Sequence, residues 1–152
     1  MSAPIVSWYN EENDEVVSNW DSGVVDAGQP GPQKTILVWN NRAGIEDVAH
    51  MQDCVLTTTD GEADTLDVVQ DKWVNCRVDS ANESVFTEIG GGDSKSIRGE
   101  GNDEGIIQGV SNDGSLEDVS NYAKVTLYVH PPLHGVSAGR RDFKLRASYF
   151  YV

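Results

Sequence analysis

Two segments near the C-terminus alternate between apolar and polar residues, and this period of two constrains the fold more than any other feature. Residues 122–130 (YAKVTLYVH) place apolar side chains at every second position from Ala123 to Val129. Residues 142–152 (DFKLRASYFYV) do the same from Phe143 to Tyr151. Because successive side chains of a β-strand point to opposite faces, each segment predicts a strand with one buried face and one face in water.

Other segments carry β-branched and aromatic residues between breaker residues, as strands do. The strongest are 34–40 (KTILVWN), 54–59 (CVLTTT) and 72–78 (KWVNCRV), and weaker signals lie at 5–9, 16–20, 68–69 and 84–89. Helix signals are poor, and the best is 44–53, where apolar residues can line one face of a short turn or two. We therefore expect seven to nine short strands and at most one short helix.

Short strands separated by Gly, Asn, Asp and Pro predict an all-β fold, an antiparallel β-sandwich or barrel of immunoglobulin-like or jelly-roll-like type. The strands do not alternate with long helices, which argues against a parallel α/β fold. The length of 152 residues suits a single β-sandwich domain over 1–152. Residues 90–121 are polar and rich in Gly and Asp, and they predict an irregular excursion with one short strand inside it.

The charge of the chain is large and uneven. The formal net charge is −14, from 11 basic and 25 acidic residues, so nucleic acid is not an expected partner. Residues 121–152 carry a net charge of +4, which leaves −18 for residues 1–120. The basic residues either pair with acidic strands of the same domain or contact an acidic neighbour, and both alternatives stay open. The four that we single out for partner binding are Arg140, Arg141, Lys144 and Arg146.

The residues that usually carry chemistry form no recognisable catalytic, metal or cofactor motif. His130 and His134 are close in sequence, but the pattern shows no third ligand that would complete a zinc site with them. The sequence also lacks the Gly-x-Ser-x-Gly motif that positions a nucleophilic serine. The glycine-rich turns lack the Lys-Ser/Thr of a phosphate loop. Cys54 and Cys76 lie in strands and are expected to be buried and reduced, although a disulfide is the alternative. We therefore expect a non-enzymatic protein that uses no cofactor.

Neither a membrane span nor a secretory signal is expected. The chain has no run of eighteen apolar residues. The N-terminal residues MSAPIVSWYNEENDE lack the basic start and apolar stretch of a signal peptide. These features favour a protein that is made in the cytoplasm and has no membrane partner.

The N-terminal segment 2–9 contains a strand-like run with two interpretations. It is either the first strand of the domain or an arm that adds to the sheet edge of a neighbour, and Ile5, Trp8 and Tyr9 are its candidate contact residues. Trp8 and Trp20 lie beside polar or acidic stretches, and if exposed they also offer a surface for sugars. The other two tryptophans, Trp39 and Trp73, lie in apolar strands and are expected in the core.

Several segments, taken together and in this order, resemble small accessory structural proteins of tailed bacteriophages. The segments are 20–28 (WDSGVVDAG), 35–42 (TILVWNNR), 51–54 (MQDC) with 57–60, 72–74 (KWV), 121–125 (NYAKV) and 142–152. Proteins of this kind are similar to head decoration proteins, which sit on the outer capsid surface and clamp neighbouring capsid subunits. Others of similar build belong to tails or baseplates.

The resemblance implies a structural virion protein that is made late in infection in the host cytoplasm and located on the capsid surface. Its expected partners are the major capsid protein and neighbouring copies of itself, as a trimer or dimer. A tail or baseplate component and a carbohydrate-binding β-sandwich module are the alternatives. The resemblance brings no catalytic residue to this chain, and a clamp needs area, shape and charge complementarity rather than chemistry.

Overall fold

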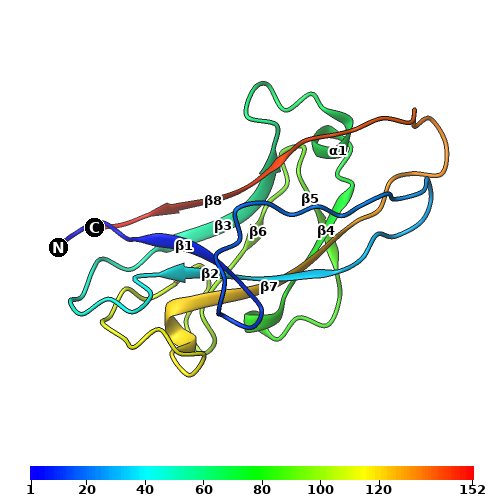
Figure 1. The fold of residues 1–152 in the computed structure, drawn as a ribbon. Coiled ribbons are helices and arrows are strands. Elements are labelled where there is room, and N and C mark those ends of the chain that lie inside the picture. The colour runs from blue at the N-terminus through cyan, green and yellow to red at the C-terminus, as the bar shows by residue number, and fades with distance from the viewer.

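The computed structural model describes residues 1–152, which form two antiparallel β-sheets packed into a sandwich (Figure 1). The five-stranded sheet has the order β1 (Val6–Asn10), β2 (Lys34–Asn40), β7 (Tyr122–Val129), β4 (Val74–Val78) and β5 (Thr87–Ile89). The three-stranded sheet has the order β6 (Lys95–Ser96), β3 (Gln52–Thr59) and β8 (Lys144–Phe150). The helical elements are α1 (Asp67–Gln70) and the 3₁₀ turns η1 (Asp79–Ala81) and η2 (Val119–Asn121). The predicted all-β sandwich of short strands is confirmed.

The main core lies between the two sheets and follows the predicted alternation. In β7 the apolar face from Ala123 to Val129 is buried in this core, and β3 contributes Cys54 and Leu56 from the opposite sheet. Burying a side chain of the size of Leu56 stabilises the fold by about 1.5–3 kcal/mol. The period of two in the sequence therefore identified the face that drives the sheets together.

A second, smaller cluster lies on the outer face of the five-stranded sheet. It consists of Leu37, Trp39 and Tyr122, with Tyr9 and Val119 packed against it, and we call it the outer-face cluster. The rings of Trp39 and Tyr122 lie 4.7 Å apart between centroids. Because Leu37 and Trp39 are fully buried here while their neighbours face the main core, β2 is covered on both faces. Trp39 is therefore buried as expected, in a cluster that the strand pattern does not show.

Three local predictions are wrong. Residues 44–53 form no helix, because the backbone N–H groups of Val48 and Ala49 donate to the distant carbonyls of Gly109 and Ser2, and the segment runs on to a bridge at Met51. Val68 and Val69 belong to the helical turn α1 and not to a strand, and two apolar residues are too few to show a period. Residues 16–20 make only a single bridge, from Val16 to Tyr9.

The irregular segment 90–121 contains β6, as expected, and asparagine side chains hold much of the rest. Asn121 Nδ2 donates to the carbonyls of Gln108 (3.0 Å) and Val110 (2.9 Å). Asn112 Oδ1 accepts from the backbone N–H groups of Ala43 and Gly114, both at 2.9 Å. These side chains satisfy backbone groups that no sheet ladder reaches, so the loops are ordered without regular secondary structure.

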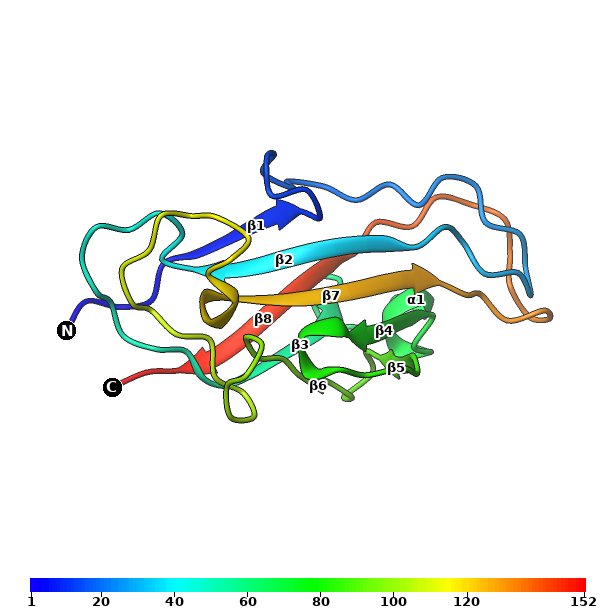
Figure 2. The same ribbon diagram turned by 90° about the horizontal axis from the view of Figure 1, so that it is seen from below.

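At the opposite end of the molecule two long segments, 21–33 and 131–142, project beyond the sheets (Figure 2). We call them the distal arm. They are joined by a hydrogen bond of 3.0 Å from Gly28 N to the Pro131 carbonyl. Val24 and Leu133 on this arm remain 96% and 64% exposed. The distal arm thus leaves large apolar side chains in contact with water.

Candidate partner-binding surface

Strand β8 lies at the edge of the three-stranded sheet and has one open side. It pairs antiparallel with β3 alone, with Lys144 opposite Thr59 and Ser148 opposite Val55. No residue from 143 to 152 makes a backbone hydrogen bond outside this ladder. In Figure 1 the strand runs along one margin of the molecule and ends beside the N-terminus. The free side of β8 therefore presents unpaired N–H and C=O groups along a strand of seven residues.

The two faces of β8 differ in chemistry. Leu145, Ala147 and Tyr149 are half-buried and pack against the main core. Lys144 and Arg146 are exposed on the other face, followed by Phe150, which is 70% exposed. The alternation predicted for 142–152 is confirmed from Phe143 to Phe150, whereas Tyr151, predicted on the inward side, lies beyond the strand and is 51% exposed. The outward face of the strand is basic with an aromatic end.

The four basic residues singled out in the sequence fall into two groups. Arg141 is used inside the molecule, since its Nε donates to Asp67 Oδ1 at 2.8 Å and its guanidinium lies 5.0 Å from the Trp73 ring centroid. Arg140 is exposed and pairs with Asp142, two residues along the chain. The remaining two, Lys144 and Arg146, have no ion-pair partner in the chain. Pairing within the domain therefore holds for Arg140 and Arg141, and contact with an acidic neighbour stays a prediction for Lys144 and Arg146.

Of the N-terminal candidates, Trp8 and Tyr9 lie in the first strand of the molecule's own sheet, and Ile5 directly precedes the strand. β1 pairs antiparallel with β2, with Tyr9 opposite Leu37. Trp8 is half-buried against the main core, and the Arg42 guanidinium lies 3.9 Å from the Tyr9 ring centroid. Only Ile5, at 57% exposure, keeps a large apolar side chain in solvent. In this chain the segment is an ordinary strand and not a free arm.

The aromatic residues considered for sugar binding pack inward. Trp8 and Trp20 are both partly buried against the main core. The Trp20 ring meets Phe143 edge-on, with centroids 5.9 Å apart. Trp73 is 6% exposed, as expected for a core residue. These tryptophans do not form a common exposed platform.

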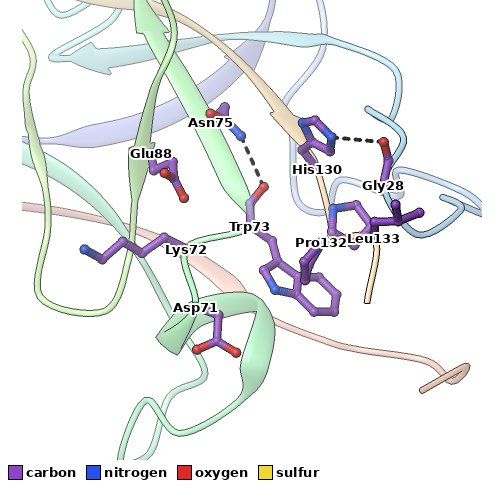
Figure 3. A pocket seen from close by; sticks show the side chains of 10 residues that line it. Gly28, Asp71, Lys72, Trp73, Asn75, Glu88, His130, Pro132 and Leu133 are labelled. Carbon is purple, nitrogen blue, oxygen red and sulfur yellow. Dashed lines mark hydrogen bonds between the residues drawn. The ribbon is translucent and has the colours of Figure 1, made fainter. Parts of the chain in front are cut away.

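One open hollow of about 580 Å³ lies at the base of the distal arm (Figure 3). Its polar groups are largely occupied, since Lys72 Nζ pairs with Asp93 at 2.5 Å and His130 Nε2 lies 3.2 Å from the Gly28 carbonyl. The hydrogen bond to Asp93 raises the pKa of Lys72, so its amine stays charged. The lining residues are Gly28, Asp71, Lys72, Trp73, Asn75, Glu88, His130, Pro131, Pro132 and Leu133. The His130 contact fastens the distal arm to the end of β7, and the Lys72 contact joins the start of β4 to the turn after β5.

The two cysteines are free and buried. Burial raises the pKa of Cys54 and of Cys76 to about 12, so both thiols stay protonated at neutral pH. A protonated thiol is a poor nucleophile and a poor metal ligand, which agrees with a packing role. His50 Nδ1 accepts a hydrogen bond of 3.0 Å from Gly109 N and thereby ties two loops together.

Scans of the chain against protein-family models, curated proteins and solved structures gave no match. None of the helices has the length and apolar character that a membrane crossing needs. No group of three or more His, Cys, Asp or Glu side chains is placed to hold a metal ion. The surface of the chain itself is therefore the feature that bears on its function.

The open edge of β8 is the feature that sequence reasoning missed. The strand itself was predicted, but whether a strand is central or at an edge depends on sheet order, which alternation does not encode. Lys and Arg on a strand are common at sheet edges, where charge discourages unwanted pairing. The presence of Lys144 and Arg146 in a predicted strand was thus the one sequence signal that this strand lies at a sheet edge.

Proposed function

We propose that this chain is a non-enzymatic structural protein of a tailed-bacteriophage virion, a head decoration protein that binds the outer capsid surface and stabilises it. The observation that carries the proposal is the basic outward face of β8 on a strongly acidic molecule. Lys144 and Arg146 stand there without partners in a chain of 25 acidic residues. The phage assignment itself comes from the resemblance of the sequence segments.

The major capsid protein is the proposed main partner, through an acidic surface that faces β8. Charge complementarity of this kind steers association and fixes the orientation of the bound protein. Many copies on a symmetric lattice bind by avidity, so each contact needs only modest affinity. The remaining acidic exterior keeps closely spaced copies from associating non-specifically.

Neighbouring copies of the chain are the second proposed partner, as a trimer or dimer on the virion. Exposed apolar side chains gather near the chain ends, where Ile5 and Phe150 are 57% and 70% exposed. Figure 1 places the two termini next to each other, beyond the ends of β1 and β8. Contacts between copies at this end would cover apolar area that the monomer leaves in water.

The test is to add the purified protein to expanded heads that lack decoration. We expect saturable binding and a higher temperature of head disruption. The double variant Lys144→Glu/Arg146→Glu should bind more weakly, while Lys124→Glu on the opposite sheet should bind as the wild type does. Absence of binding to expanded heads would overturn the proposal, and imaging that finds density only on the tail would replace the head by the tail as its location.

A further inference from the structure

The free side of β8 is longer than the other sheet edges in the molecule, and no segment of the chain covers it. The strand has seven residues, no proline and no bulge, since the irregularity of the β3–β8 ladder lies in β3 between Gln52 and Val55. No segment of the chain forms backbone hydrogen bonds with this side. Edges of this kind accept a further strand readily, because each added residue pairs backbone groups already in place.

The side chains around this edge specify what kind of strand it accepts. On one face Lys144 and Arg146 are exposed and have no acidic partner in the chain. On the other face Leu145 and Tyr149 are only half-buried, so a neighbouring strand would cover apolar area still in contact with water. A matching strand thus alternates acidic residues with apolar ones.

We propose that β8 is the docking edge for an extended acidic segment of another protein, which adds as a fourth strand to the β6-β3-β8 sheet. The inference rests on the proposed function and deepens it by naming how the partner is recognised. Backbone hydrogen bonds to β8 give the attachment. Carboxylates opposite Lys144 and Arg146 select an acidic partner, because directly opposed side chains in a sheet lie only about 4.5–5.5 Å apart.

A second copy of the chain fits this edge less well. A two-fold pairing of β8 with β8 centred on Arg146 places that residue directly opposite its own copy. Centring the pair on Ala147 makes the two Arg146 side chains diagonal neighbours on one face. Like charges placed in this way are unfavourable. The edge therefore favours an acidic strand over another β8.

The test uses a capped peptide of alternating glutamate and valine, long enough to span β8, at low ionic strength. We expect it to bind and to slow hydrogen exchange at the amides of residues 144–150. The variant Lys144→Glu/Arg146→Glu should lose affinity by about tenfold and should bind the matching lysine–valine peptide instead. The control Lys124→Glu reverses one charge on the other sheet, a net change of −2 against −4 for the double variant, and should leave binding unchanged.

A peptide N-methylated at alternate residues separates strand addition from simple charge attraction. Equal binding of this analogue would overturn the proposal, as would peptide binding without protection of the β8 amides. Protection of those amides without peptide, together with a dimeric mass, would assign the edge to a second copy instead. If the protein binds to heads but does not bind the peptide, this inference is refuted and the proposed function is not. If the protein binds the peptide but does not bind to heads, the proposed function is refuted and this inference is not.

Discussion

The two strands next to the chain ends, β1 and β8, both lie at sheet edges, yet only one of these edges is closed by the chain itself. Val17 N donates to the Trp8 carbonyl at 2.9 Å, and Asn10 N donates to the Glu15 carbonyl at 3.0 Å, so the outer side of β1 is partly covered. The outer side of β8 has no such contacts. An edge that the chain covers contributes to stability, whereas an edge left open remains available to a partner.

The largest effect that distinguishes the two edges is expected at Trp8. Replacing Trp8 by Ala removes a large side chain packed against the main core and should lower the free energy of unfolding by about 2–3 kcal/mol, somewhat less than for a fully buried Trp. Urea unfolding measures this change, and Trp8→Phe should recover most of it. Loss of particle binding by a Trp8→Ala variant of unchanged stability would instead support the arm interpretation of residues 2–9.

The next effect concerns Asn13, in the turn that follows β1. Asn13 Oδ1 accepts from Trp39 Nε1 and from Arg42 Nε, both at 3.0 Å. Asn13→Ala leaves the donor of a fully buried indole without its partner and should cost about 1–3 kcal/mol of stability. Thermal unfolding and the fluorescence of Trp39 report the change, with Asn19→Ala as a control at an exposed position that has no hydrogen bond to the cluster. Equal stability of the two variants would contradict this role for Asn13.

On the β8 side the expected effect is on binding and not on stability. Lys144→Glu/Arg146→Glu should weaken binding to heads by about tenfold, roughly 1.4 kcal/mol, and should leave the unfolding midpoint nearly unchanged because both side chains are exposed. Added salt should weaken wild-type binding in the same direction, since screening acts on exposed charges. A fall in stability with unchanged binding would show that the basic face serves the fold alone.

The smallest effect is a pH dependence in the loop after β3. Hydrogen bonds from the backbone N–H groups of Glu62, Asp64 and Leu66 hold the pKa of the Asp60 carboxyl below its usual value. A carboxyl with a lowered pKa stabilises the folded loop above its unfolded pKa, and this contribution disappears as the pH falls through the folded pKa. The hydrogen-exchange protection of residues 60–66, measured relative to the intrinsic exchange rate at each pH, should therefore fall on acidification. Asp60→Asn should remove most of that dependence, and an unchanged profile in this variant would refute the assignment.

The strands were predictable where the period of two was long, and the loops were not. Residues 122–130 and 143–150 place the expected faces inward. The predicted helix at 44–53 failed because long-range hydrogen bonds organise that segment, with Val48 N donating to the Gly109 carbonyl at 2.8 Å. Such bonds join residues far apart in the chain and leave no local period. The sequence could not have shown them by pattern alone.

The basic residues of the candidate surface were likewise only partly predictable from the sequence. Arg141 and Lys144 belong to one basic segment, yet Arg141 pairs with Asp67 from a distant helical turn, while Lys144 faces solvent. Sequence distance gives no information on which acidic residue a basic residue will pair with. The four basic residues could therefore be identified from the sequence, but those paired within the chain could not be distinguished from those without a partner. Because Arg141 is paired within the chain, the basic part of the candidate surface is limited to the outward face of β8 and the exposed Arg140.

By itself the sequence determined the fold class, the inward face of the long strands and the separation of charge, because these follow from local side-chain order and composition. Only the tertiary structure decided that β8 is an edge, that β1 is covered and that Arg141 is used internally. Those properties depend on which strands become neighbours, and neighbours are chosen by packing across the whole core rather than by any one segment.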